Sequence, residues 1–238
     1  RQAETLARKA GVPLVLKTAL VRDVTKPRPT LPPGVTVTDD PRQVLDDPDI
    51  DIVVELMGGF QPAFDIIKQA LERGKSVVTA NKEVLAKEGH FLRALAARKG
   101  LDLFYEASVG GGIPIIQPLR DCLVGNRIHQ VMGIINGTTN YMLTRMSREG
   151  GDFEAILRDA QAKGYAEADP SSDVEGHDAA YKLAILASLA FETPVAIDQV
   201  YREGITRITP EDIRYGQELG YVLKLLAIAK EVDGEIEA

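Results

Sequence analysis

The sequence is poor in the residues that stabilise secreted proteins or contact nucleic acids. Its 238 residues include one cysteine, Cys122, so no internal disulfide can form and a reducing cytoplasm is the favoured compartment. Tryptophan is absent and aromatic residues make up 5%, which leaves no platform for stacking nucleic-acid bases. The formal net charge of -7 also argues against a nucleic-acid partner, although an ordinary acidic surface accounts for it equally well. A small molecule is therefore the expected partner.

Long apolar runs and clustered metal ligands are missing too. No stretch approaches the ~20 apolar residues of a membrane span, and the first residues do not resemble a signal peptide, so we expect no membrane partner. The three histidines, His90, His129 and His177, are not spaced as a metal-binding set, which favours a structural role for each. Cys122 lies in the segment LRDCLVG, where we expect a small core residue.

The first hundred residues alternate between helix-like and strand-like stretches. Their patterns predict helices over 1–10, 39–45, 61–73 and 83–99. Strands are predicted over 14–23, 34–40, 50–58, 75–82 and 101–109. The run 50–58 is compact and apolar, which is typical of a strand buried on both faces of a parallel sheet. This alternation predicts an α/β fold with a doubly wound parallel sheet, of the Rossmann-like nucleotide-binding type.

The pattern changes after residue 112. Strands predicted over 127–136 and 195–206 are separated by long helices over 152–163 and 176–191, and the chain stops where another strand begins, within 229–238. This mixture predicts an α+β domain. We therefore divide the chain into a nucleotide-binding domain over 1–112 and a second domain over 113–238.

One part of a dinucleotide-binding domain is missing from the pattern. Such a domain normally begins with a strand, a Gly-rich turn that holds the phosphates, and a helix. Residues 1–10 already have the pattern of that first helix. We expect an N-terminally incomplete domain rather than a fold without the turn, and a Gly-x-Gly-x-x-Gly turn before Arg1 would complete the cofactor site.

Three predicted strands end in chemically distinctive residues, and ligands of parallel sheets bind beyond these carboxyl ends. Arg22 ends the first strand, where an arginine suits the 2′-phosphate of NADP, although a plain loop arginine fits equally well. Met57 and Gly58 end the run 50–58, and glycine lets a backbone approach a bound ring or phosphate. Asn81 and Lys82 place an amide and a positive charge above the sheet. A lysine after a strand is common, so Lys82 alone does not define a site.

Two further segments contain groups that bind ions. The segment 106–114 includes three consecutive glycines, and its backbone carbonyl oxygens suit a hard cation, but a flexible hinge between the domains is the favoured reading. Residues 136–140 follow a strand and open a helix with a hydroxyl cap. Their backbone N–H groups suit an anion such as a substrate carboxylate, and simple capping of the helix is the alternative.

The helix predicted over 176–191 carries the most informative side chains. On a helical wheel Lys182 lies between Leu186 and Leu189, and Asp178 projects from the same apolar stripe. Burying an unpaired lysine is costly, so this placement favours a functional cleft, with a lysine stem packed on leucines as the alternative. The stretch that leads into this helix is rich in acids, some of which would only cap it: Glu167, Asp169, Asp173 and Glu175.

Four motifs occur in order along the chain: TANKEVLA, EASVGGGIPII, GIINGTTNYML and GYAEADPSSDVEGHDAAYKL. Together they closely resemble the homoserine dehydrogenase family. The resemblance implies an enzyme that reversibly reduces L-aspartate 4-semialdehyde to L-homoserine with NADP or NAD, on the pathway to threonine, methionine and isoleucine. It also implies a homodimer or higher homo-oligomer, in which the second domain provides catalysis, substrate binding and the dimer interface through its sheet.

The resemblance also implies roles for individual residues. Lys182 matches the acid that protonates the carbonyl oxygen and the base of the reverse reaction, and Asp178 matches its supporting carboxylate. The matched substrate-binding positions are Glu167, which would hold the ammonium group, with Asp173, Tyr165, Gly137 and Thr138. The cofactor positions are Lys82, Met57 and Gly58, to which the strand ends add Arg22 and Asn81. A sodium-type cation site is matched by backbone oxygens of Glu106, Val109, Gly111 and Ile113.

Two other functions stay open. One is a non-catalytic, truncated body that dimerises and binds amino acids without a cofactor, which titration with NADPH would distinguish from the enzyme. The other is a related dehydrogenase of another amino acid, which comparison of homoserine with other amino alcohols would identify. Many family members carry a regulatory ligand-binding domain at the C-terminus, and we do not expect one within these 238 residues.

Overall fold

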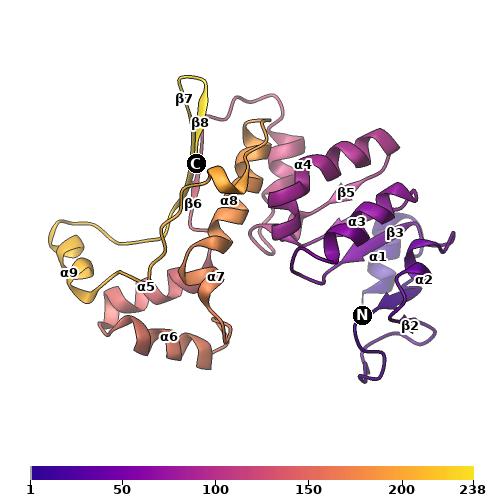
Figure 1. The fold of residues 1–238 in the computed structure, drawn as a ribbon, viewed down its shortest axis with the longest axis horizontal. Coiled ribbons are helices and arrows are strands. Elements are labelled where there is room, and N and C mark those ends of the chain that lie inside the picture. Colours follow the sequence, from indigo (N-terminus) through magenta and orange to yellow (C-terminus); the bar gives the residue numbers. More distant parts are fainter. Residues whose placement is uncertain (1) are drawn as a thin grey trace.

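The computed structural model describes residues 2–238 (Figure 1). Its α-helices are α1 (Ala3–Ala10), α2 (Arg42–Leu45), α3 (Ala63–Glu72), α4 (Lys82–Lys99), α5 (Gly137–Glu149), α6 (Phe153–Ala162), α7 (Ser171–Val174), α8 (His177–Ala190) and α9 (Pro210–Glu218). Its strands are β1 (Thr18–Leu20), β2 (Thr36–Thr38), β3 (Ile52–Glu55), β4 (Ser76–Thr79), β5 (Leu103–Phe104), β6 (Gln130–Gly133), β7 (Ala227–Val232) and β8 (Glu235–Glu237). Short helical turns are η1 (Glu106–Ser108), η2 (Pro118–Cys122) and η3 (Ile197–Gln199). The predicted helix over 1–10 is α1, except that Arg1 lies outside the described residues.

The first part of the fold is built on parallel strands. β1 pairs with β2, and β3, β4 and β5 form a second sheet in that order. The predicted α/β class with parallel strands is confirmed. Within residues 2–238, however, no strand joins β1 to β3, so the strands form two sheets instead of one. The carboxyl ends of β3 and β4 lie side by side, since Glu55 and Thr79 are paired in register.

The prediction that the run 50–58 is buried on both faces is wrong. Val53 and Glu55 are buried, whereas Ile52 and Val54 are 51% and 60% exposed. Helices α3 and α4 pack against each other and against the same sheet, so they cover one of its faces. An apolar run does not reveal how many of its faces are covered, which is why the sequence misled here.

The second part of the fold contains an antiparallel sheet in the order β6–β7–β8. The long helices predicted over 152–163 and 176–191 are present as α6 and α8, and most of 229–238 forms the β7–β8 hairpin. The strand predicted over 195–206 is wrong, because this stretch contains the turn η3. Two of its backbone N–H groups donate to side chains rather than to a neighbouring strand, that of Val195 to Ser188 and that of Ala196 to Gln199.

Helix α8 lies between the two parts of the fold (Figure 1). On one side, Ile185 and Leu186 belong to the hydrophobic core of the parallel sheet and its helices. On the other, Ala184 and Ala187 pack in a core that includes Ala229 of β7. The position of α8 is therefore set by both parts, and its first turn faces the start of α4, where β4 has just ended.

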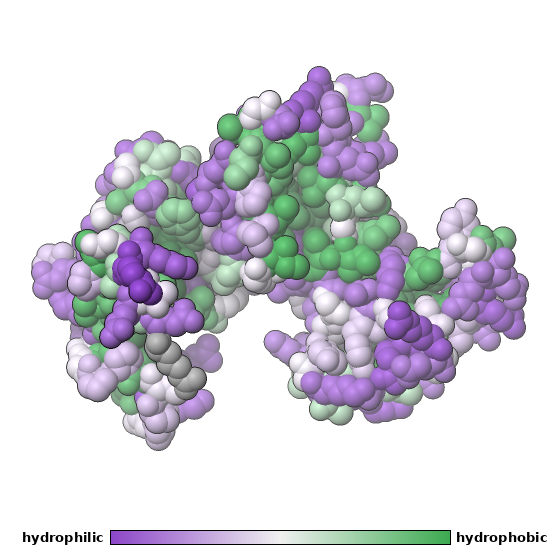
Figure 2. Space-filling view, turned by 180° about the vertical axis from the view of Figure 1, so that it is seen from behind, coloured by the Kyte–Doolittle hydropathy of each residue, from purple (hydrophilic) through white to green (hydrophobic). Residues whose placement is uncertain are grey.

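One face of the antiparallel sheet is apolar and exposed. Met132 and Ile228 are paired in register and are 62% and 38% exposed, and Ile134 and Leu226 extend the apolar surface. These four residues form what we call the outer sheet face. The alternate residues of β7 are buried toward α8, so the outer sheet face points away from that helix. Figure 2 shows hydrophobic side chains gathered over this part of the molecule.

The structure also bears on membrane-spanning helices and on the position of Cys122. No helix within residues 2–238 combines the length and the apolar character that crossing a bilayer requires. The prediction that Cys122 is a core residue is wrong, because its side chain is exposed at the end of η2. In that turn Leu119, not Cys122, packs against the core.

Candidate active site

The first turns of α8 carry a buried ion pair. Asp178 and Lys182 are four residues apart, so they lie on the same side of the helix. The Nζ of Lys182 lies 2.6 Å from Oδ2 of Asp178 and also donates to the carbonyl oxygen of Ile135 at 3.0 Å. The side chain of Asp178 is 3% exposed and that of Lys182 18%. This burial agrees with the wheel, which placed both residues on the apolar side of the helix.

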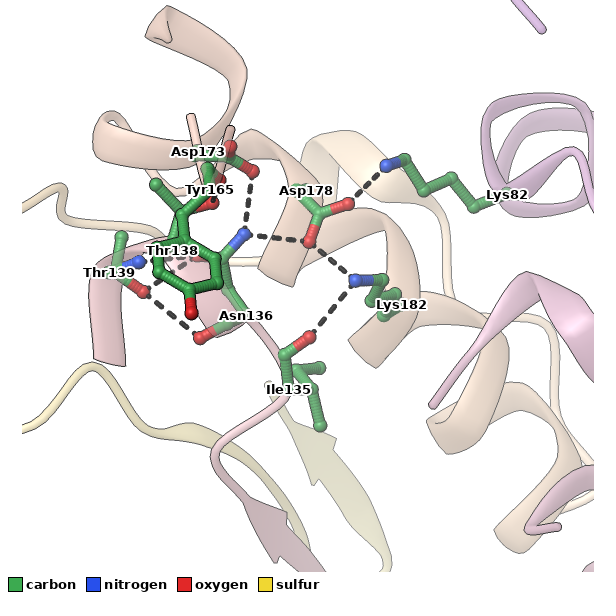
Figure 3. A network of polar contacts seen from close by, with 9 residues as sticks. All are labelled: Lys82, Ile135, Asn136, Thr138, Thr139, Tyr165, Asp173, Asp178 and Lys182. Atoms are coloured by element: carbon green, nitrogen blue, oxygen red, sulfur yellow. Dashed lines mark hydrogen bonds and ion pairs between the residues drawn. The ribbon is translucent and has the colours of Figure 1, made fainter. Parts of the chain in front are cut away.

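A second lysine shares the same carboxylate (Figure 3). Lys82, the first residue of α4, forms an ion pair with the other oxygen of Asp178. The side-chain amide of Asn136 donates to Oδ2 of Asp178 at 2.9 Å. Asp178 therefore receives donors from three segments: from its own helix, from the end of the parallel sheet, and from the junction between β6 and α5.

These donors decide the charge of Asp178. Burial alone would raise the pKa of its carboxyl, because a buried anion loses the stabilising contact with water. Hydrogen bonds from Lys182, Lys82 and Asn136 outweigh burial and hold the pKa below its ordinary value of 3.8. Asp178 is therefore ionised at neutral pH, and it holds two ammonium groups together.

Asn136 links the site to helix α5. Its Oδ1 accepts the backbone N–H of Thr139 at 2.8 Å, so it caps the helix, and its amide nitrogen remains free to donate to Asp178 and, at 2.7 Å, to Asp173. The cap is an amide oxygen rather than the predicted hydroxyl. We did not predict Asn136 as a site residue. An asparagine between a strand and a helix was the signal that could have identified it, because an amide can cap and donate at once.

The predicted substrate positions on α5 and before α7 also meet. The hydroxyl of Thr138 donates to the carbonyl oxygen of Tyr165 at 2.7 Å. Tyr165 is 57% exposed, and its ring lies 4.7 Å, centroid to centroid, from the ring of Tyr141. Tyr141 in turn is hydrogen-bonded to Asp159 at 2.6 Å. Tyr165 is therefore held at the edge of the site by its backbone and by its ring.

Most of these groups line one pocket of about 830 Å³. The predicted site residues that line it are Lys82, Gly137, Thr138, Tyr165, Asp173, Asp178 and Lys182. Arg145 and Arg148 of α5 line it as well, and no pattern in the sequence had marked them. Glu167 does not line the pocket: its side chain is exposed, and its carbonyl oxygen accepts a hydrogen bond from Gln161 at 3.0 Å.

The predicted cofactor positions lie at the carboxyl ends of parallel strands. After β3 the backbone turns through Gly58 and Gly59, with φ angles of +74° and +71°, which favour glycine. A Cβ atom built at either position would meet no atom within 4 Å, so this turn borders open space. Asn81 donates to the carbonyl oxygen of Gly59 at 2.7 Å. Arg22 is exposed just after β1, away from the pocket lining.

The predicted cation site lies beyond β5. The carboxylate of Glu106 accepts the backbone N–H groups of Ile115 at 2.6 Å, Ile116 at 2.9 Å and Gln117 at 2.8 Å. Burial raises the pKa of Glu106, but these three donors outweigh it and leave the pKa below its ordinary value. Because the carboxylate is engaged in this way, a cation here would be bound by backbone carbonyl oxygens. Residues 2–238 contain no group of three or more His, Cys, Asp or Glu side chains placed to hold a metal.

Parallel strands that end in an open glycine turn, beside a pocket lined mainly by a second, α+β unit, are typical of dinucleotide-binding proteins. Comparison with known families gives the same answer in more detail. The family model for the homoserine dehydrogenase NAD binding domain matches residues 1–106, and that for homoserine dehydrogenase matches residues 114–238. The chain belongs to the homoserine dehydrogenase family.

Individual relatives support the same family assignment. The homoserine dehydrogenase of Mycobacterium tuberculosis H37Rv is 50% identical over 97% of this chain. The crystal structure of a homoserine dehydrogenase from Thiobacillus denitrificans matches 99% of this chain with a TM-score of 0.94 and 48% identity. A hyperthermophilic archaeal homoserine dehydrogenase in complex with NADPH matches 83% of this chain, with a TM-score of 0.70 and 31% identity. The matched regions are 52%, 55% and 57% of those three chains, so this chain spans about half the length of the relatives it matches.

Proposed function

We propose that the protein is a homoserine dehydrogenase that reversibly reduces L-aspartate 4-semialdehyde to L-homoserine with NADP or NAD. The observation that supports this most directly is the pairing of Lys182 with the buried Asp178 in a pocket next to the ends of parallel strands. Reduction of an aldehyde needs a hydride at carbon and a proton at oxygen. A titratable group held at the reacting oxygen supplies the second requirement.

Lys182 is the proposed proton donor. An ammonium group has three N–H bonds, and two of those of Lys182 are directed to Asp178 and to the carbonyl oxygen of Ile135. The third is left for a ligand in the pocket. Lys182 gives this proton to the aldehyde oxygen as negative charge develops there, and in the reverse direction it takes the proton from the hydroxyl of homoserine. Asp178 keeps the ammonium in position and balances its charge.

Substrate recognition follows from the charges around the pocket. The backbone N–H groups of Gly137 and Thr138 lie in the first turn of α5, where the helix leaves them without partners, and they suit the substrate carboxylate. Asp173 lines the pocket and offers an anion to the substrate ammonium. Glu167 shares this role in the proposal, which requires its exposed side chain to turn inward. The ring of Tyr165 closes one edge of the pocket.

The residues at the strand ends fit a dinucleotide. The open turn at Gly58 and Gly59 leaves space beside the backbone, and Met57 and Asn81 form its surroundings. A bound NADPH or NADH would supply the hydride for the aldehyde carbon. Lys82 directly follows Asn81, which is bonded to the turn, and it shares Asp178 with Lys182, so we expect it to contact both cofactor and substrate. Arg22 favours NADP in this proposal, because the neighbouring Asp23 is already hydrogen-bonded to Thr25 at 2.6 Å.

We also propose a sodium-type cation bound by the backbone oxygens of Glu106, Val109, Gly111 and Ile113. Such oxygens are the ligands that hard cations prefer, and the engaged carboxylate of Glu106 holds residues 115–117 against this loop. The proposal further includes a homodimer formed through the outer sheet face, because a flat apolar surface of this kind is buried in stable assemblies. The cytoplasm is the compartment that the single cysteine favours.

The test compares the kinetics of the intact parent protein with those of the Lys182→Ala variant. Homoserine should be oxidised with NADP, and other amino alcohols should react far more slowly. Lys182→Ala should abolish turnover while the circular dichroism spectrum and the affinity for NADPH, measured by fluorescence, stay unchanged. Full activity of Lys182→Ala would refute the assigned proton transfer. Failure of the parent protein to bind NADPH would exclude the enzyme altogether and leave the non-catalytic alternative.

A further inference from the structure

A chain of buried hydrogen bonds joins the ends of β3 and β4. Glu55, the last residue of β3, is 2% exposed, and its Oε2 accepts the hydroxyl of Thr79 at 2.6 Å. Thr79, the last residue of β4, is also 2% exposed and accepts the backbone N–H of Asn81 at 2.9 Å. The other carboxylate oxygen of Glu55 accepts the backbone N–H of Met57 at 2.6 Å. The two strand ends are therefore locked to each other through side chains.

The same chain continues into the glycine turn. Asn81 is 6% exposed and donates from its amide to the carbonyl oxygen of Gly59 at 2.7 Å. Its Oδ1 accepts the backbone N–H of Val84 at 3.1 Å, which caps α4. Met57 is thus held at one end of the turn and Gly59 at the other. The cap also fixes the first residue of α4, Lys82.

Glu55 is unusual because it is a buried acid without a cationic partner among the described residues. Within residues 2–238, no lysine, arginine or histidine nitrogen lies within the 4.0 Å limit of an ion pair with it. A buried carboxylate without a cation lowers the stability of the folded chain. Two apolar side chains in place of Glu55 and Thr79 would fill the same space without this loss of stability. The two hydrogen bonds that it accepts are therefore the feature that accounts for an acid at this position.

We propose that Glu55 and Thr79 are positioning residues for the cofactor: they hold the backbone turn from Met57 to Gly59 in the shape that binds a nicotinamide dinucleotide. This inference rests on the proposed function, since it assumes that the turn contacts a dinucleotide. Neither residue touches the pocket that contains Lys182. Their loss therefore affects the affinity for the cofactor more than the affinity for homoserine.

The chain offers a closely matched control. Thr38 is the last residue of β2, is 4% exposed, and accepts the backbone N–H of the residue two positions later at 3.0 Å, as Thr79 does. Thr38 does not donate to a buried carboxylate. Thr79→Val and Thr38→Val thus remove the same atoms from equivalent places in two parallel strands, and they differ in the link to Glu55.

The experiment measures the NADPH dissociation constant by fluorescence and the KM values for NADP and homoserine in the intact protein. Thr79→Val should raise the NADPH dissociation constant about tenfold, or about 1.4 kcal/mol, and change the KM for homoserine less than twofold. Thr79→Ser should restore the affinity, because it keeps the hydroxyl. Glu55→Gln should weaken binding in the same direction. Thr38→Val should bind NADPH as the parent does.

Each outcome has a definite meaning. Unchanged NADPH affinity in a folded Thr79→Val protein, or an equal loss in Thr38→Val, would overturn the inference. Hydrogen exchange of the amide of Met57, whose N–H donates to Glu55, adds a measurement that needs no catalysis, and Thr79→Val should accelerate it at least tenfold. A parent protein that binds NADPH but oxidises no homoserine would overturn the proposed reaction alone. A parent that binds no dinucleotide would overturn both.

Discussion

Replacement of Asp178 by asparagine removes one charge from the centre of the site and keeps its shape. The carboxylate accepts three hydrogen bonds, from Lys182, Lys82 and Asn136. An amide has one acceptor oxygen, and its NH₂ group would face one of these donors. Both lysines then lose their common anion. Asp178→Asn should therefore lower both stability and turnover.

The size of the effect follows from burial. Removing one partner of a buried ion pair costs about 3–5 kcal/mol when the remaining charge is fully buried. Here the remaining charges border a pocket, and the lysine side chains are 18% and 38% exposed, so about 2–3 kcal/mol is expected. In a chain of this length that corresponds to a fall in Tm of about 4–12 °C. A misplaced proton donor should lower kcat about 100-fold.

The pH dependence provides a second measurement. The pKa of Asp178 is lowered in the folded protein, so its charge stabilises the fold fully above the ordinary value of 3.8. This stabilisation is lost as the pH falls through the lowered pKa. The difference in unfolding free energy between the parent and Asp178→Asn should be constant above pH 3.8 and shrink below it. Denaturant titrations at several pH values measure this difference.

Asp159→Asn is the matched control. Asp159 also accepts from two cations and a neutral donor, namely Lys163 at 2.9 Å, Arg145 at 2.7 Å and Tyr141 at 2.6 Å. It contacts neither Lys182 nor Lys82. Asp159→Asn should lower Tm and leave kcat within a few-fold of the parent, and any kinetic change should appear in the KM for homoserine, because Asp159 supports Tyr165 through Tyr141. Equal losses of kcat in the two variants, or a fully active Asp178→Asn protein, would refute the role assigned to Asp178.

Three further predictions concern the cofactor, the packing and the assembly. Arg22→Ala should raise the KM for NADPH about tenfold and leave that for NADH unchanged, because one charge-assisted contact to phosphate is lost; equal changes would contradict it. Gly204→Ala would place a Cβ atom 2.4 Å from a carbonyl oxygen of α7 and should lower stability by about 1–3 kcal/mol. Gly125→Ala would place a Cβ atom with no other atom within 4 Å, so its stability should equal that of the parent. Calorimetry of the two variants measures this difference. Ile228→Lys should convert a dimer to a monomer in sedimentation experiments, while Val12→Lys should not; an unchanged dimer would exclude the outer sheet face.

Much of the architecture could be predicted from periodicity. The helices over 61–73, 83–99, 152–163 and 176–191 were correct to within a few residues, because their apolar positions repeat along whole helices. Burial across a sheet was not predictable, because exposure of Ile52 and Val54 depends on which face the helices cover. The false strand over 195–206 has a similar cause: its backbone donors are taken by side chains such as Ser188, which no local pattern reveals.

Individual residues of the candidate site could be named from the sequence, but the contacts between them could not. The wheel and the family motifs identified Lys182 and Asp178, which lie on one helix. They did not reveal that Lys82 shares the same carboxylate from 96 positions away. Contacts of this kind depend on how two separate parts of the fold meet. Asn136 and Glu55 were missed for the same reason, since each acts through a partner that is distant in the sequence.

The double packing of α8 has a consequence for how the protein is made. Ile185 and Leu186 complete the core of the parallel-sheet part, although most of that core is encoded by the first half of the chain. During synthesis the first half leaves the ribosome before α8 exists. Its α4 surface must therefore stay open until the second half has been translated, and protease sensitivity of ribosome-bound chains should end when residues 177–190 emerge. The protein should then melt in one cooperative transition, because the parallel-sheet part has no finished interior without α8.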